Sequence, residues 1–594
     1  MTPRRPVRIA NCSGFYGDRV AAARDVVEGG PVDVLTGDYL AELTMLILWK
    51  ARQKDPSAGY AKTFLTQMEQ VLGTCLDRGI RVVANAGGLN PSGLAHELAE
   101  LAGRLGLSPR IAYLHGDDLA DRVPTLVAEG HRLAHLDTGQ ALADSGAKPV
   151  TANAYLGGWG IAEALAADAD IVVCPRVTDA SLVVGPAAWW HGWDRTDHDA
   201  LAGAVAAGHV IECGPQATGG NYAWISEVTD RRRPGFPIAE VAHDGSSVIT
   251  KHPGTGGLVS PGTVTAQLLY EIDAPAYPNP DVVAHFDTVR LAQVGPDRVE
   301  ISGATGSPPP PDLKVAVNFL GGYRNTMTLV LTGLDIEEKA AWARAQLFDI
   351  LGGESAFEQV DVRLLRFDQP DAPTNEQATA HLRVTVMDPD PVKVGRRFSN
   401  AAMELALGGY AGFHTTTPPT AESAYGVYWP TLVPADTVSH RVVLPDGSER
   451  VVPHGDPVPF APPTPGPADP RTAGPVTVPA GPTRRAPLGL VCAARSGDKG
   501  GNANIGLWTR DRASYAWLSA YLTEDRLREL LPEAADLAVR RWELPNLNAL
   551  NLVVVGILGS GVASSPRPDP QAKGLGEYLR SRHVDIPVAL LDER

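Results

Sequence analysis

Cysteine is scarce in this chain: there are five among 594 residues, widely spaced and without a C-x-x-C pair. An odd, scattered set is typical of reduced thiols in a cytoplasmic protein, and it argues against a disulfide framework or a zinc knuckle. Cys174 and Cys213 have no histidine close to them in the sequence. We therefore expect both to be small buried hydrophobic residues rather than nucleophiles.

Long apolar runs are also absent. No segment approaches the roughly 20 apolar residues that a membrane span needs, and the first residues, MTPRRPVRIANCSG, lack the apolar stretch of a signal peptide. Basic residues are outnumbered 52 to 68, and the net charge of −16 argues against general binding to nucleic acid or an anionic membrane. We expect a cytoplasmic protein acting on a small molecule, with room for a local basic pocket.

Several standard catalytic signatures are missing. The chain has no P-loop, no G-x-S-x-G elbow and no H-E-x-x-H helix, which removes several common enzyme classes. The side chains of His252, His414, Asp179 and Glu212 could bind a metal, but no two of them are at ligand spacing. We therefore predict no metal site.

One glycine loop resembles a dinucleotide-binding fingerprint. Gly158-x-Gly160-x-x-Glu163 has glutamate where glycine or alanine belongs, and this glutamate would repel a pyrophosphate. Asp179 lies 21 residues after Gly158, near the expected position of a ribose-binding acid. Because the motif is incomplete, we identify no cofactor, and an NAD(P)-dependent oxidoreductase stays an alternative.

Short apolar segments alternate with helical segments over residues 6–225. This alternation predicts a doubly wound parallel α/β sheet, with polar residues collecting at the carboxyl ends of the strands. The expected strands include Val7–Asn11, Arg81–Asn85, Pro149–Leu156, Asp170–Pro175 and a last one starting at His209. We expect the strand Pro149–Leu156, a helix over 161–167 and the strand Asp170–Pro175 to form one βαβ unit. Thr36 or Asp38 is expected to cap a helix that runs to Lys50.

The character of the chain changes after residue 225. Period-two runs surround one amphipathic helix, Ile336–Leu351, which predicts an α+β part over 226–452, with a hairpin turning at Pro445-Asp446-Gly447. These two parts make a large domain, 1–452. Residues 453–487, rich in Pro, Gly, Ala and Thr, are predicted to be a semi-rigid linker. Residues 488–594 are predicted to form a small ferredoxin-like β/α sandwich.

The loops between these elements contain the candidate site. Four ionisable residues could act as general acids or bases once burial has shifted their pKa values. They are Asp179, Glu212, Lys251 and His252. Others could bind substrate through backbone N–H groups or polar side chains. These are Asn85, Gly87, Gly88, Asn153, Gly157, Gly158, Arg176, Thr178, Asn221, Asp498 and Lys499.

Each of these loops has a structural alternative. The glycines can serve only the close packing of a strand against a helix, and Ser92 can simply cap the helix after the Asn85 loop. Asp498, Lys499 and Arg567 can bind an anion or hold two domains together. A single loop would favour the structural interpretation, but several loops meeting at one sheet edge favour a shared site.

Nine long motifs resemble those of the AtuA family, named for acyclic terpene utilisation. They are IANCSGFYGDR, VVANAGGLNPSG, AYLGGWGIAEAL, VVCPRVTDASLVVGP, IECGPQATGGNY, KHPGTGGLVSPGTV, RSGDKGGNANIGLW, NLNALNLVV and GSGVASSPRPD. The resemblance spans nearly the whole chain and implies a large domain followed by a small one. It implies a role in the breakdown of branched acyclic terpenoid acyl-CoAs, such as those from citronellol and geraniol, and it carries over no catalytic residues.

Our leading hypothesis is a cytoplasmic enzyme of lyase or hydratase type. It would act on a branched acyl-CoA, with the coenzyme A thioester as substrate, or on a related carboxylic acid. General acid–base residues and an oxyanion-stabilising glycine loop would carry the reaction. We also expect a homo-oligomer. Besides the oxidoreductase, the alternative is a non-catalytic scaffold or subunit, whose C-terminal domain binds a partner enzyme of an acyl-CoA pathway.

Overall fold

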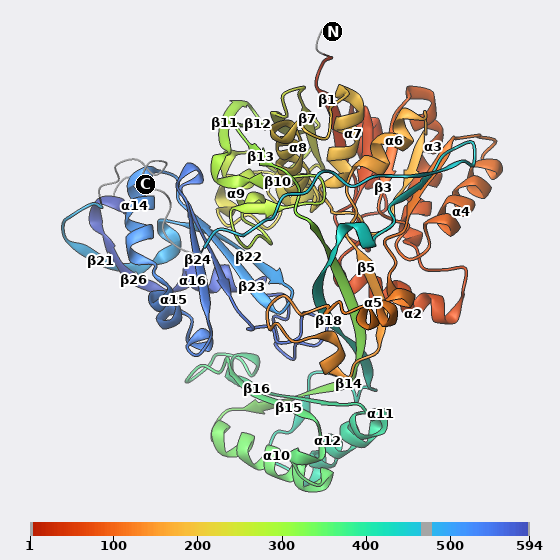
Figure 1. Cartoon of the computed structure of the whole chain (residues 1–594). Coiled ribbons are helices and arrows are strands. Elements are labelled where there is room, and N and C mark those ends of the chain that lie inside the picture. The colour runs from red at the N-terminus through yellow and green to blue at the C-terminus, as the bar shows by residue number, and fades with distance from the viewer. Residues whose placement is uncertain (1–3, 465–477, 592–594) are drawn as a thin grey trace. The chain divides into compact units, whose positions relative to one another are not determined.

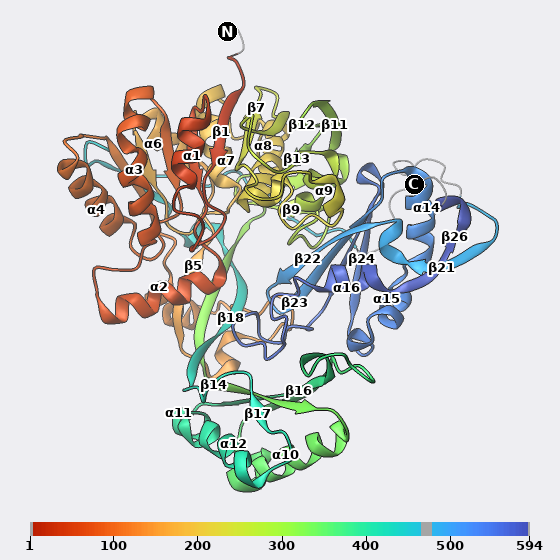
Figure 2. The same ribbon diagram turned by 180° about the vertical axis from the view of Figure 1, so that it is seen from behind.

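The structure is a computed structural model that describes residues 4–464 and 478–591. The chain forms two compact units (Figures 1 and 2). The first comprises Met1–Asn318, Tyr428–Val562 and Asp569–Arg594, and the second comprises Phe319–Val427 and Ala563–Pro568. No helix among the described residues is long and apolar enough to cross a membrane.

A sheet of eleven strands is the centre of the first unit, and its middle five strands are parallel. In spatial order these are β1 (Val7–Asn11), β2 (Val34–Gly37), β3 (Arg81–Ala84), β6 (Ile171–Val173) and β4 (Ile111–His115). β1, β2, β3 and β6 are short apolar runs, as expected for strands covered on both faces. The predicted parallel α/β arrangement is therefore confirmed.

Helices cover both faces of this sheet (Figures 1 and 2). One face carries α1 (Ala22–Gly29), α3 (Lys62–Arg78) and α4 (Pro91–Arg104), and the other carries α6 (Trp159–Ala166), α7 (Ser181–His191) and α8 (His198–Ile211). Alternate strand residues such as Ala10, Leu35 and Val82 share a core with the first group. This alternation follows from the two-residue period of a strand.

Antiparallel strands extend the parallel region on both sides. β7 (Pro237–Val241), β8 (Ser247–Lys251), β12 (Arg298–Ser302) and β11 (Arg290–Gly295) continue the sheet from β1. The hairpin of β19 (Arg441–Val443) and β20 (Glu449–Val451) continues it from β4 and confirms the turn predicted at Pro445-Asp446-Gly447. Strands from the predicted α+β part thus complete the first sheet.

The predicted βαβ unit is wrong. β5 (Pro149–Ala154) does not pair with β6; it pairs with β14 (Asp312–Thr332), far along the chain. The backbone N–H of Tyr155, just after β5, donates to the carbonyl of Lys314 at 2.9 Å. An apolar alternation identifies a strand but says nothing about which distant strand it joins.

The strand predicted to start at His209 is also wrong. His209 belongs to the last turn of α8, and Glu212 is the residue that caps this helix. Every residue from Leu201 to Ile211 is buried, so this part of the helix shows no polar face. A helix buried all round has no 3.6-residue polar periodicity, and a short piece of it resembles a buried strand.

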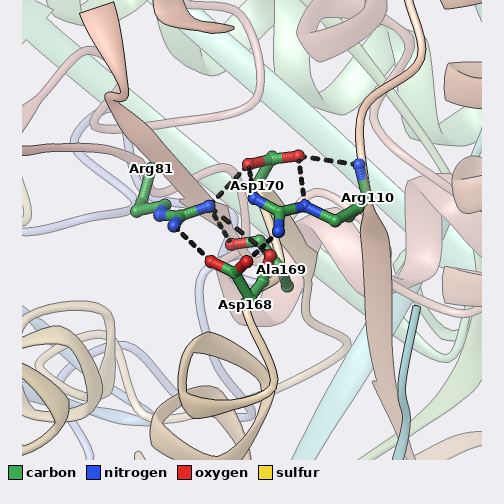
Figure 3. Close-up of polar contacts among 5 residues, drawn as sticks. All are labelled: Arg81, Arg110, Asp168, Ala169 and Asp170. Carbon is green, nitrogen blue, oxygen red and sulfur yellow. Dashed lines mark hydrogen bonds and ion pairs between the residues drawn. The ribbon is translucent and has the colours of Figure 1, made fainter. Parts of the chain in front are cut away.

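Two arginines and two aspartates connect the amino-terminal ends of neighbouring parallel strands (Figure 3). Arg81, which starts β3, pairs with Asp168 at 2.7 Å and with Asp170 at 2.5 Å. Arg110, just before β4, pairs with Asp170 at 2.8 Å, and its backbone N–H donates to the same carboxylate at 2.9 Å. These contacts hold the start of β6 between its two neighbouring strands.

The second unit is a smaller α+β body. It contains the later part of β14 with β15 (Gln359–Arg366), β16 (Thr379–Asp388) and β17 (His414–Thr415). α10 (Ile336–Leu351) and α12 (Arg396–Gly408) pack on these strands around a core that includes Leu347 and Phe398. α10 matches its predicted bounds, because its apolar and charged faces alternate clearly.

The C-terminal domain is a β/α sandwich, as predicted. Its antiparallel sheet contains β22 (Ala493–Lys499), β23 (Asn502–Trp508), β25 (Ala549–Val554) and β24 (Val539–Leu544), in this order. α14 (Arg512–Tyr521), α15 (Glu524–Leu530) and α16 (Leu575–Ser581) complete it. Part of the predicted linker, 465–477, lies outside the described residues. Its last five residues form β21 (Thr483–Pro487), which pairs with β26 (His583–Pro587).

Candidate active site

Polar residues collect where the parallel strands end. Asp38 follows β2, Asn85 follows β3, Asp117 follows β4 and Arg176 follows β6, and all four are buried. The Asn85 amide donates to Asp38 Oδ1 at 2.6 Å, and its oxygen accepts from the Tyr39 backbone at 2.7 Å. Parallel strands bring their carboxyl ends to one edge, which is where ligands bind in such sheets.

Arg176 is the central positive charge of this edge. Its side chain is only 3% exposed and pairs with Asp179 at 2.7 Å. The same nitrogen donates to the Leu40 carbonyl at 3.1 Å, and the guanidinium lies 4.3 Å from the centre of the Tyr155 ring. Its Nε has no hydrogen-bond partner among the described residues. A buried charge needs such compensation, and the Nε of Arg176 is a donor free to bind a ligand.

A second charged pair lies beside Arg176. Glu42 is the first residue of α2 (Glu42–Lys54); its carboxylate accepts from the Tyr155 hydroxyl at 3.0 Å and lies 3.6 Å from the Lys314 amino group. Burial alone would raise the pKa of Glu42, but Lys314 and Arg176 outweigh it and lower this pKa to about 2. Glu42 therefore stays ionised, and its position at a helix N-terminus adds to that preference.

Glu212 has the opposite environment. It lies at the carboxyl end of α8, which the Asn11 amide fixes by donating to the carbonyls of Ile211 and Glu212 at 2.7 and 2.8 Å. Burial, followed by the negative charges of Asp179 and Asp38, raises the pKa of Glu212 well above its usual value. His209 lies 3.4 Å away, but burial lowers its pKa to about 3 and leaves it neutral.

Asp38, Asp179 and Glu212 together form what we call the carboxyl cluster. Burial is the main reason why the pKa values of Asp38 and Asp179 are raised; the charge of Asp179 adds to the shift at Asp38, whereas Arg176 opposes the shift at Asp179. When carboxyls disfavour each other's charge, the pKa of one of them is raised more strongly than that of the other. Such a cluster can both donate and accept protons.

The end of β22 brings the C-terminal domain to the large domain. The Lys499 amino group donates to the Glu271 carbonyl at 2.7 Å. Lys573 lies 3.8 Å from Asp498 and 3.9 Å from Glu271. Burial, followed by the charge of Glu271, raises the pKa of Asp498 to about 7. Asp498 and Lys499 thus face the large domain, as the sequence suggested, with Lys573 as the additional cation.

The predicted glycines do not offer open space to a ligand. A Cβ on Gly157 would lie 2.1 Å from Asp281 Oδ1, and the N–H of Gly158 already donates to the other oxygen of this carboxylate at 2.7 Å. A Cβ on Gly87 would lie 2.7 Å from the Cys174 carbonyl, and one on Gly88 would meet Leu48. These glycines serve close packing, which was the structural alternative.

Other predicted residues have local partners of their own. Lys251 ends β8 and pairs with Asp297 at 2.9 Å, and His252 lies against α1 at 2.8 Å from the Val26 carbonyl. The Thr178 hydroxyl contacts that of Ser181 at the start of α7, and Asn221 is an exposed residue with φ of 57°. Asn153 does reach the sheet edge, where it donates to Asp117 at 2.8 Å.

Several members of the site were not among the residues predicted from the sequence. They are Asp38, Glu42, Asp117, Glu271, Lys314 and Lys573. Asp38 was interpreted as a helix cap, although its position directly after an apolar strand was the signal for a site residue. Lys314 lies inside β14, whose alternating pattern gives no sign of a function. Among the described residues, no three His, Cys, Asp or Glu side chains converge as metal ligands.

The fold and the site define an α/β protein with ionisable groups gathered at the carboxyl edge of its sheet. Residues 7–444 match the model of the family described as acyclic terpene utilisation family protein AtuA. Residues 486–585 match the AtuA ferredoxin-like domain. The chain therefore belongs to the AtuA family. Neither the curated proteins nor the solved structures contain a match to it.

Proposed function

We propose that the protein is an enzyme of lyase or hydratase type that acts on a branched acyl-CoA or a related carboxylic acid. The observation that carries this proposal is the carboxyl cluster, in which the pKa of Glu212 is raised well above its usual value while Arg176 pairs with Asp179 at 2.7 Å. Membership of a family named for acyclic terpene utilisation supports a branched, acyclic substrate.

Hydration of an α,β-unsaturated thioester needs both a base and an acid. Water adds to the β-carbon, a carboxylate accepts the proton that this water loses, and a carboxylic acid donates a proton to the α-carbon. The product is a 3-hydroxyacyl thioester, and elimination of water is the reverse reaction. Asp179 suits the base, because Arg176 favours its charged form, and Glu212 suits the acid.

Cations at the same edge suit an anionic or polarised acyl group. Arg176 has an unpartnered Nε, and Lys314 lies 4.8 Å from the Tyr155 ring centre. These charges are local, since the whole chain has a net charge of −16. They can bind a carboxylate or polarise a thioester carbonyl, which makes the neighbouring carbon more acidic. The predicted glycines face protein atoms, so we propose that the cations, and not a glycine loop, stabilise the polarised carbonyl.

The proposal predicts that Glu212→Gln lowers turnover of a branched α,β-unsaturated acyl-CoA by about 10²–10⁴-fold, the range typical of a lost general acid. Glutamine keeps the shape of the side chain but has no acidic proton to transfer at neutral pH. Formation of the 3-hydroxyacyl thioester, followed by mass spectrometry, measures the effect. Glu69→Gln, at an exposed position on α3, is the matched control and should keep wild-type turnover.

The alternatives make different predictions. A scaffold would bind a partner enzyme and leave all thioesters unchanged, so turnover by the purified chain alone contradicts it. The oxidoreductase finds no support in the geometry, because the Gly158 loop does not follow a strand of the parallel sheet and its N–H is bound to Asp281. We further propose a cytoplasmic homo-oligomer, and light scattering of the purified chain tests the oligomeric state.

A further inference from the structure

Glu271 has an unusual backbone conformation. It lies three residues after α9 (Pro261–Leu268), and its φ of 58° places it in the left-handed region. Glycine, and to a lesser degree Asn and Asp, adopt this region readily, whereas a glutamate does so at a cost. Strained residues persist when their surroundings hold them, and they gather at functional sites.

The C-terminal domain provides the groups that hold this backbone. The Glu271 N–H donates to Asn504 Oδ1 at 2.8 Å, and the Glu271 carbonyl accepts from Lys499 Nζ at 2.7 Å. The Asn551 amide donates to the Asp273 carbonyl at 2.6 Å and to that of Ile272 at 3.3 Å.

These side chains support one another. Asn504 and Asn551 lie on the neighbouring strands β23 and β25, are fully buried, and are hydrogen-bonded to each other. Lys499 ends β22, the next strand of the same sheet. A buried amide pair with satisfied partners has one preferred arrangement, so it holds the segment at Glu271 in place. The motifs RSGDKGGNAN and NLNALN supply these three residues.

The carboxyl group of Glu271 lies among ionisable groups from both domains. Lys573 is 3.9 Å away, and Lys573 also approaches Asp498 at 3.8 Å. Burial raises the pKa of Glu271, and Lys573 opposes this shift. The charge of Glu271 in turn contributes to the raised pKa of Glu212, which connects this group to the carboxyl cluster.

We propose that the C-terminal domain is a positioning domain. Its residues Lys499, Asn504 and Asn551 hold Glu271 in the left-handed conformation and so fix this carboxyl group beside Lys573, which also approaches Asp498. The catalytic use of Glu271 rests on the function proposed above. The positioning itself does not, because it concerns the backbone conformation and can be measured without a substrate.

Glu271→Gly tests the held conformation. Glycine accepts the left-handed region without strain, so we expect Tm at about pH 5 to rise by about 1–3 °C. Glu271→Gln keeps both the strain and the shape, and should leave Tm unchanged under the same conditions. Both variants should lose turnover at least tenfold. A Glu271→Gly variant less stable than Glu271→Gln would contradict the proposal.

Asn504→Ala tests the role of the C-terminal domain, with Asn546→Ala as its matched control. Asn546 donates to the carbonyls of Phe286 and Val289, so its removal also costs hydrogen bonds to the large domain but leaves Glu271 held. Tm is measured from about pH 5 to 8. The ionisable groups around Asp498 include Glu271, Glu42, Tyr270 and the cation Lys573. Asn504→Ala removes the acceptor of the Glu271 N–H and should let the Glu271 carboxyl move away from Asp498. The pKa of Asp498 should then fall, and the dependence of Tm on pH should change.

Asn546→Ala should instead lower Tm equally at every pH. Parallel pH profiles for the two variants would overturn the proposal. If Asn504→Ala does not fold, the comparison of Glu271→Gly with Glu271→Gln decides alone. If the wild-type protein turns over no thioester, the proposed function fails, while the stability measurements still decide whether Glu271 is held.

Discussion

Two glutamates in one site show how the surroundings determine the behaviour of a residue. Glu42 lies at a helix N-terminus between Lys314 and Arg176, and its pKa is about 2 despite burial. Glu212 lies at a helix C-terminus near two aspartates, and its pKa is raised well above the ordinary value. Environments that separate the pKa values of like groups are what acid–base chemistry requires. The helix dipole favours the same separation.

Asp117 predicts a pH dependence of stability. Burial, followed by the charge of Asp118, raises its pKa to about 7, whereas the ordinary value is near 3.8. The folded protein thus binds a proton that the unfolded chain has lost, and this contribution to stability is present below about pH 4 and disappears as pH rises to about 7. For one proton the slope is at most about 1.4 kcal/mol per pH unit.

Asp117→Asn removes this proton and should weaken the loss of stability between about pH 4 and 7. Urea denaturation at several pH values measures the free energy of unfolding and its slope against pH. Asp121→Asn, at an exposed position, should reproduce the wild-type dependence. Equal slopes for Asp117→Asn and the wild type would show that Asp117 titrates normally.

For single residues, the sequence predicted where side chains that follow a parallel strand lie. Asn85 and Arg176 follow β3 and β6 and are buried at the carboxyl ends of the strands, as the parallel arrangement implies. Glu212 was expected after a strand but ends α8, and the roles of these residues stay predictions. Lys314 could not be found, because only the pairing of β14 with β5 brings it to the site.

Among the elements, the glycine loop before α6 packs against Asp281 and is not an open ligand site. Gly157→Ala should lower stability by about 1–3 kcal/mol, because a Cβ there would lie 2.1 Å from the Asp281 carboxylate. Gly103→Ala in α4 is the control: its Cβ meets nothing within 4 Å, and alanine favours a helix by about 1 kcal/mol. Thermal melting compares the two variants. A neutral Gly157→Ala would restore the loop as a candidate ligand site.

The arginine–aspartate contacts in Figure 3 make a second prediction at this scale. Asp170 is 16% exposed and pairs with both arginines, whereas Asp168 is 60% exposed. We expect Asp170→Ala to cost about 1–3 kcal/mol and Asp168→Ala less than about 1 kcal/mol. Chemical denaturation measures both. Equal costs would mean that burial of Asp170 does not strengthen its ion pairs.

Helices show clearly what local sequence can reveal. α10 was predicted with its observed bounds because its charged face contrasts with its buried one. α8 is buried on all sides from Leu201 to Ile211, so the same rule found no helix and suggested a strand. Periodicity reports a difference between two faces, and an element without such a difference gives no signal.

For the whole molecule, the order of the domains was predictable and their composition was not. The family resemblance and the alternation of strands and helices gave the large domain and the small sandwich. The strands β7, β8, β11 and β12 and the hairpin of β19 and β20 nevertheless belong to the same sheet as β1. Pairing between distant segments depends on three-dimensional packing, which local patterns do not encode.

The central claim is that the carboxyl cluster transfers protons to the carbon skeleton of an acyl thioester. Incubation of the purified chain with a branched α,β-unsaturated acyl-CoA in D₂O tests it most directly, with deuterium at the α-carbon measured by mass spectrometry. We expect the wild type to place one solvent deuterium there, and Glu212→Gln to do so at least about 100-fold more slowly. Absence of deuterium in the wild-type reaction, or equal incorporation by Glu212→Gln, would contradict the account.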